Sequence, residues 1–231
     1  MQYSLNWKIL IFVILLFLVL PTIVAADQNT VLSLDEVLQH VQTRQETLST
    51  FSADFKQVQK NALFIAPQTS AGRLYFDRVG ILLMKMHQPE PFVVLLTQGK
   101  MISGTPGSPL RQKNIPGGNT FLQKMLGIGR SAEQLKKQFH IRMNPSPDGD
   151  LYALELRPVK ITRRMPYLKI KAEIDSQIWL PLSLQLVEPG GDSVGFTFRY
   201  TRINTPLPEN IFDIGPIEPH STPSDDTHES K

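Results

Sequence analysis

The sequence predicts a mainly β (α+β) fold: an incomplete antiparallel barrel of about eleven strands, closed by an N-terminal helix and a short helical lid. Apolar residues follow helical spacing over residues 33–50 and then alternate with a period of two in a series of short segments. Turn-forming residues separate most of these segments, and helical patterns between them are confined to one interruption. This arrangement favours an antiparallel sheet that curls on itself over a parallel sheet with crossover helices.

The first element, residues 33–50, has the pattern of an amphipathic helix. Ser33 and Glu36 form a capping box, in which each side chain can bind a free backbone amide of the first turn. Polar residues lie on the opposite side, so one face of the helix is expected to cover either a core or a cavity. The apolar stripe consists of Leu34, Val37, Leu38, Val41 and Leu48.

The predicted strands follow this helix, and alternation within them separates the two faces of the sheet. The segment from Phe92 to Leu96 is apolar throughout, so this strand is expected to be covered on both faces. The predicted ranges are 51–56, 70–76, 81–87, 92–97, 101–105, 110–115, 139–144, 151–157, 167–174, 182–187 and 194–203.

Adjoining strands carry apolar residues of one parity, which we expect to form an inward-facing wall. Ile81 and Lys85 have the opposite parity and are expected to face outward. Methionine is flexible and adapts to acyl chains of varied shape, so these residues would suit an apolar cavity. A barrel filled by its own side chains fits the same composition. The predicted lipid-cavity residues are Leu74, Phe76, Leu82, Met84, Met86 and Phe92.

Residues 116–138 interrupt the strand pattern. Glycines flank a short apolar piece, and Ser131 then begins a short helix with Glu133 in its first turn. The apolar piece is either a hinged lid over the barrel or an ordinary helix that fills its mouth. The predicted lid residues are Phe121, Leu122, Met125 and Leu126.

The two ends of the chain differ in composition from the domain between them. Lys8, an apolar run and small residues up to Ala26 have the pattern of a secretory signal peptide, here residues 1–26. Retention of this segment as a membrane anchor is the alternative. Residues 27–218 are expected to form one domain, and the polar residues 219–231 a disordered tail. We therefore expect an exported protein.

The sequence offers little for catalysis, and this favours a binding protein over an enzyme. Cysteine is absent, so a thiol nucleophile and thiolate metal ligands are excluded. The five histidines lack metal-ligand spacing, and motifs for nucleotides or acyl transfer are missing. We expect no cofactor, no metal and a monomer. The net charge of +3 is too small for nucleic-acid binding.

One basic group stands out from this mild charge. It consists of Arg163, Arg164, Lys169 and Lys171. The group either meets an anionic membrane or partner, or is a solvated edge strand.

The motifs along the chain resemble a known family, the periplasmic outer-membrane lipoprotein carriers (LolA-like proteins). Residues 51–57 match the family's Phe-x-Ala-x-Phe-x-Gln strand start, and residues 72–78 match its Gly-x-Leu-aromatic strand and turn arginine. Gln88-Pro89 and the closing segment 204–212 continue the likeness. Val79 and Met84 replace the family's usual proline and tryptophan, so the chain resembles a divergent member.

The resemblance implies an apolar cavity that shields acyl chains, whose exposure to water costs about 0.8 kcal/mol per methylene. It implies an acylated lipoprotein or lipid as cargo, an inner-membrane release complex as donor and an outer-membrane acceptor. In the family the turn arginine holds the lid closed, a role that maps onto Arg78; a solvated turn residue is the alternative. The same fold also serves as a lipid- or lipoprotein-sensing module of envelope-stress regulators.

Overall fold

The computed structural model describes residues 32–61, 66–97, 99–115, 131–145, 150–161 and 167–215. They belong to one compact unit, residues 31–231. The expected signal peptide, lid and tail lie outside the described residues, as do Arg163 and Arg164.

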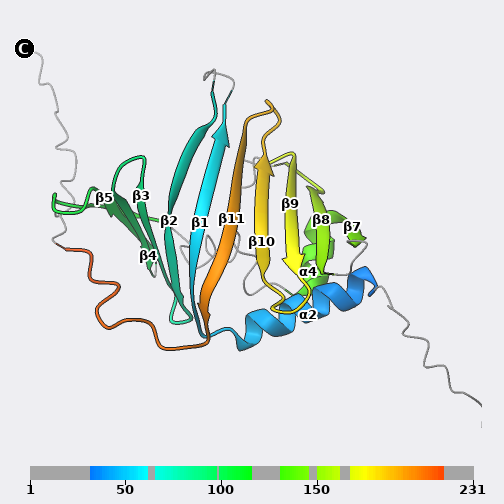
Figure 1. Ribbon diagram of the computed structural model, residues 1–231. Coiled ribbons are helices and arrows are strands. Elements are labelled where there is room, and N and C mark those ends of the chain that lie inside the picture. Colours follow the sequence, from blue (N-terminus) through cyan, green and yellow to red (C-terminus); the bar gives the residue numbers. More distant parts are fainter. Residues whose placement is uncertain are drawn as a thin grey trace, which may run out of the picture. The chain divides into compact units, whose positions relative to one another are not determined.

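The unit is built on one antiparallel sheet of eleven strands, in the order β6-β5-β4-β3-β2-β1-β11-β10-β9-β8-β7 (Figure 1). Strands β6 and β7 are its two edges, so the sheet stays open, and the predicted incomplete barrel is confirmed. The strands are β1 Thr50–Lys60, β2 Gln68–Asp77, β3 Ile81–Gln88, β4 Phe92–Thr97, β5 Lys100–Gly104, β6 Arg111–Asn114, β7 Phe139–Pro145, β8 Leu151–Pro158, β9 Lys169–Asp175, β10 Pro181–Val187 and β11 Ser193–Ile203.

Helix α2, Leu34–Thr47, begins at the predicted capping box, in which Ser33 and Glu36 bind each other's backbone amides. It ends before the expected residue 50, because the side chain of Asn204 forms hydrogen bonds with backbone groups at the end of the helix. The Asn204 Nδ2 donates to the carbonyl of Thr47 at 2.9 Å, and its Oδ1 accepts from the amide of Ser49 at 2.8 Å. A contact with a residue far along the chain therefore sets the end of this helix.

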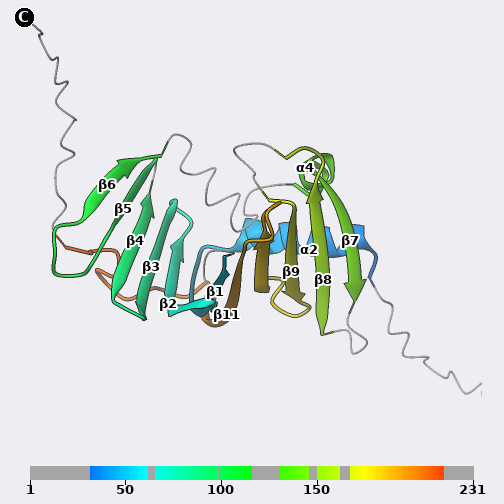
Figure 2. The same ribbon diagram turned by 90° about the horizontal axis from the view of Figure 1, so that it is seen from above.

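Helix α4, Ala132–Gln138, starts at Ser131 as predicted, with a second capping box to Gln134. The amide of Ala132 donates to Oε1 of Gln42 in α2 at 3.1 Å, which ties the two helices together. Both helices lie on one side of β8 and β9 (Figure 2). The cluster that joins them contains Val37, Leu38, Leu135, Tyr152, Leu154, Ala172 and Ile174.

The sheet has apolar residues on both faces at the β3–β4 end. Leu82 and Leu96 belong to a cluster on the inner face, and Leu83, Val93 and Leu95 belong to another cluster on the outer face. The segment after β11 packs against this outer cluster through Ile211, Phe212 and Ile214. The strand is therefore covered on both faces over residues 93–96, as expected, whereas Phe92 at its start is 37% exposed.

Candidate apolar binding face

Strands β2, β3 and β4 bring the six predicted cavity residues to one face of the sheet. Leu74 lies opposite Met84, Phe76 opposite Leu82, and Met86 opposite Phe92. Directly opposed residues project to the same side of a sheet. Five of the six join one cluster: Leu74, Phe76 and Leu82 are buried in it, and Met84 and Met86 pack against it.

Ile81, which has the opposite parity, faces the outer side of the sheet, as predicted. This residue packs against the outer cluster of Leu83 and Val93 rather than the inner one. Alternation in β3 therefore separates the two faces of the sheet as predicted.

Burial falls steadily along this wall. On β3 it decreases from Leu82, which is 1% exposed, to the half-buried Met84 and Met86. On β4 the same direction leads from Leu96, 7% exposed, to Phe92, 37% exposed. The two strands are antiparallel and in register, so both gradients run toward the same end of the sheet. The wall is a packed core at one end and accessible apolar surface at the other.

Aromatic residues extend this face across β1 and β11. Phe51 stacks on Phe76 with 5.2 Å between ring centroids and meets the edge of Tyr200 at 5.5 Å. Phe196 and Phe198 stack at 6.1 Å. The residues on β11 were not predicted as part of the site, although an aromatic residue at every second position from 196 to 200 was a usable indication.

Tyr200 carries the polar atom of this aromatic group. Its hydroxyl donates to the carbonyl of Pro181 at 3.1 Å. Burial raises the pKa of Tyr200 well above its usual range, because a charged phenolate loses its hydration there. The phenol therefore stays neutral, and the face keeps its apolar character.

Arg78 lies in the turn between β2 and β3. Its backbone amide donates to the carbonyl of Ser49 at 2.8 Å, and Asp77 stabilises the turn by accepting from the amide of Val79 at 2.9 Å. The Arg78 side chain is exposed and forms no hydrogen bond or ion pair with any residue that the structure describes. The predicted lid lies outside those residues, so a bond between the two stays a prediction.

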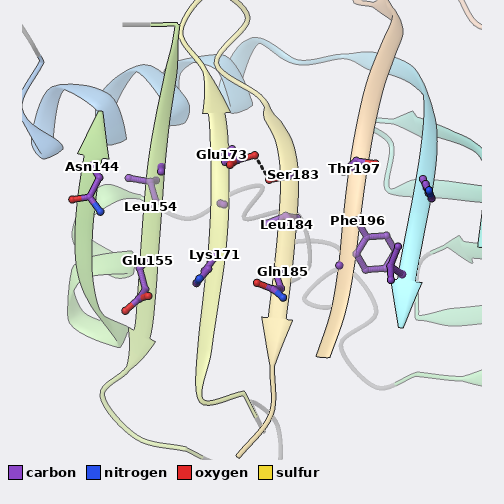
Figure 3. A pocket seen from close by; sticks show the side chains of 15 residues that line it. Asn144, Leu154, Glu155, Lys171, Glu173, Ser183, Leu184, Gln185, Phe196 and Thr197 are labelled. Carbon is purple, nitrogen blue, oxygen red and sulfur yellow. Dashed lines mark hydrogen bonds between the residues drawn. The ribbon is translucent and has the colours of Figure 1, made fainter. Parts of the chain in front are cut away.

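A concave trough of about 660 Å³ lies on the other face of the sheet, across strands β7 to β11 and β1. Most of its lining residues, among them Lys56, Lys171 and Ser183, have the parity opposite to that of the inner clusters. Four residues of the inner clusters, Leu154, Ala172, Leu184 and Phe196, also border it. Figure 3 shows Lys171 and Ser183 on the neighbouring strands β9 and β10. The sequence analysis did not predict this hollow, because it depends on the curvature of the sheet.

The described part of the chain contains no group of three or more histidine, aspartate or glutamate residues placed to hold a metal ion. In the same ranges, no helix combines the length and apolar character needed to cross a bilayer. Side-chain nitrogen and oxygen atoms that are buried there all have hydrogen-bond partners.

Comparison with known proteins gives the family. No curated protein matches the sequence. Among solved structures, a LolA superfamily protein from Nitrosomonas europaea is 12% identical, with 78% of this chain and 97% of that chain covered and a TM-score of 0.38. The Mycobacterium tuberculosis lipoprotein LppX is 11% identical, with coverages of 76% and 99% and a TM-score of 0.39. MucB of the Pseudomonas aeruginosa MucA/MucB complex is 14% identical, with coverages of 76% and 59% and a TM-score of 0.45.

The family model described as outer membrane lipoprotein carrier protein LolA matches residues 46–215. This range runs from the end of α2 through all eleven strands to the segment behind β3 and β4. The protein belongs to the LolA family.

Proposed function

We propose that the protein is a periplasmic carrier that shields the acyl chains of lipoproteins, or of a related lipid, on the inner face of its sheet. Membership of a family of lipoprotein carriers supports this proposal and favours a binding protein over an enzyme. The donor would be an inner-membrane release complex and the acceptor an outer-membrane protein. An N-terminal signal peptide over residues 1–26 would direct its export.

The observation that carries the proposal is the fall in burial along β3 and β4. Met84 and Met86 are half-buried and Phe92 is 37% exposed, although all three are apolar. Each methylene that moves from water to such a surface gains about 0.8 kcal/mol. Methionine side chains adapt to acyl chains of different shape. Leu82 and Leu96, which are buried at the other end of the same two strands, hold the backbone of this surface in place.

Site-specific photo-crosslinking tests the proposal. A photoreactive amino acid would replace Met84 or Met86, with Lys85 as the matched control on the other face of the same strand. The protein would be irradiated with a synthetic diacylated lipopeptide. We expect labelling from positions 84 and 86 and little from 85. Equal labelling from all three positions would contradict the assignment of the inner face.

Arg78 would hold the lid, formed by Phe121, Leu122, Met125 and Leu126, in its closed position. A hydrogen bond to a charged group is worth about 1.5–3 kcal/mol, and about 1.4 kcal/mol corresponds to a tenfold change. Arg78→Leu should therefore shift the equilibrium between the closed and open lid about tenfold or more toward the open state. The variant protein should then hold its cargo longer and release it poorly. Transfer of labelled lipopeptide to acceptor vesicles measures this effect.

Val79→Ser in the same turn is the matched control, because Val79 is 65% exposed and is not expected to touch the lid. Normal transfer by a folded Arg78→Leu protein would make Arg78 a solvated turn residue only. Isolation of the protein with a regulatory membrane protein, and without lipid, would instead favour the sensor module.

A further inference from the structure

The trough on the outer face is defined by six neighbouring strands, from β7 at one edge to β1 in the middle of the sheet. Neighbouring strands are about 4.8 Å apart, so the trough is roughly 24 Å long. Its volume of about 660 Å³ falls within the range of pockets that take ligands. Three of the residues that line it, Ala153, Ser183 and Gly195, have small side chains or none, so they leave space above the backbone of the sheet.

The charges in the trough are unevenly satisfied. Glu173 accepts a hydrogen bond from the hydroxyl of Ser183 at 2.7 Å (Figure 3). Glu155 accepts from Nε of Arg157 at 2.8 Å. Lys56 and Lys171, by contrast, form no hydrogen bond or ion pair with the residues that the structure describes. Lys171 lies directly opposite Glu155 without forming an ion pair, so both ammonium groups keep unused donors and can bind an anionic group.

The surroundings of the trough strengthen this bias. Arg142 lies directly opposite Glu155 on β7, and Lys169 follows the same face of β9. The hydrogen bond from Arg157 lowers the pKa of Glu155, and the charges of Lys169 and Lys171 lower it further. The β7–β9 end of the trough, with Arg142, Lys169 and Lys171, therefore has a positive potential that Glu155 and Glu173 do not cancel.

The shape of the trough selects among anionic partners. A bilayer surface is flat and would touch the rim, whereas a single extended chain can reach the floor. Lys56 and Lys171 lie on strands three spacings apart, and the register places Lys171 in line with Val58, two residues along β1 from Lys56, so the two positions are roughly 16 Å apart. In an extended peptide, residues four positions apart point to one side and are separated by about 14 Å. An extended segment with carboxylates at this spacing, crossing the strands obliquely, can reach both ammonium groups because lysine side chains are long and flexible.

We infer that the outer trough of β7–β11 and β1 is a docking site for an extended acidic segment of a partner protein, bound through Lys56 and Lys171. The site is separate from the inner face and from the lipid proposed to bind there. A carrier with two such faces could hold its cargo on one and be recognised by a partner on the other.

The test uses a fluorescein-labelled decapeptide with two glutamates four positions apart and serine elsewhere, and measures its fluorescence anisotropy. The double variant Lys56→Glu/Lys171→Glu should weaken binding at least tenfold. Lys100→Glu/Lys113→Glu makes the same change in charge on the distant strands β5 and β6 and should alter it less than twofold. Failure of the wild-type protein to bind, or equal loss in both double variants, would overturn the proposal.

A filling variant separates the trough from general electrostatic attraction. A Cβ at Gly195 would meet only the carbonyls of Val58 and Leu184, at 3.8 and 4.0 Å, which are ordinary contacts, so the backbone there accepts a Cβ without strain. Gly195→Phe should abolish peptide binding with the charge unchanged, while crosslinking of lipopeptide to position 86 continues. Wild-type peptide binding by Gly195→Phe would overturn the proposal, as would lysine-dependent binding of phosphatidylglycerol vesicles without peptide binding.

Discussion

Gly72 holds β2 unusually close to β3, next to the irregularity in register between Ala71 and Gly72. A Cβ built on Gly72 would lie 2.2 Å from the carbonyl oxygen of Lys85 and 2.8 Å from Cα of Met86, where real Cβ atoms are essentially never closer than 3.0 Å. The atoms in the way belong to the backbone and cannot rotate aside. Gly72→Ala therefore forces the two strands apart at this point.

The cost of this change can be estimated from its two parts. Overpacking a well-packed site costs about 1–3 kcal/mol, and the upper end applies because the obstacle is backbone. Loss of unfolded-state freedom offsets about 0.4–1 kcal/mol of this cost. The net destabilisation is about 2 kcal/mol, or roughly a 30-fold change in the folding equilibrium. Lipopeptide binding should weaken as well, because Leu74 and Met84 lie on the separated strands.

Gly195→Ala is the control, because its Cβ would make only ordinary contacts in the strand β11. Urea denaturation followed by circular dichroism gives the midpoint for both variants. We expect a lower midpoint for Gly72→Ala and an unchanged or slightly higher one for Gly195→Ala. Equal midpoints would show that the strands can move apart freely, and the close-approach argument for Gly72 would be wrong.

Two further predictions concern a helix contact and a charge network. His40 stacks on Trp179 with 4.2 Å between ring centroids, and Trp179 stacks on Tyr152 at 5.6 Å. Trp179→Ala should lower the free energy of unfolding by about 3 kcal/mol, and His40→Ala should lower it by about 0.5–1.5 kcal/mol. A double-mutant cycle that gives additive losses would contradict direct coupling. The hydrogen bond from Arg73 lowers the pKa of Asp54, so its stabilisation is present above pH about 4 and is lost as the pH falls through the folded pKa. Asp54→Asn should lose about 0.2–1 kcal/mol at pH 7 and match the wild type in strong acid, as measured by urea denaturation across pH.

Alternation explains why the inner wall could be predicted from the sequence. In a strand, every second side chain points to the same face, so local pattern alone places Leu82, Met84 and Met86 together. Pairing with β2 then follows from a short turn at residues 78–80, which sets the register. The aromatic residues of β11 could not be placed beside this wall in the same way. Strand β11 pairs with β1, and the two strands are far apart in the sequence.

Contacts between distant segments account for what the sequence did not indicate. The end of α2 depends on Asn204, and the outer cover of β4 depends on Ile211 and Phe212. The outer trough depends on how six strands curve together, and most of its outward-facing lining residues are polar, small or charged like those of any solvated face. Periodicity describes one element at a time, so it carries no information about these three features.

An open sheet is useful to a carrier only if its two edges do not pair with other chains, and the edges of this sheet have the residues that prevent it. Strand β6 exposes Arg111 and Lys113, and strand β7 exposes His140 and Arg142. Charged side chains on edge strands oppose pairing with a further strand, because the incoming chain would have to desolvate them. Charge at both edges therefore opposes pairing with further strands, so the apolar inner face can stay open to the proposed cargo without making the sheet a template for aggregation.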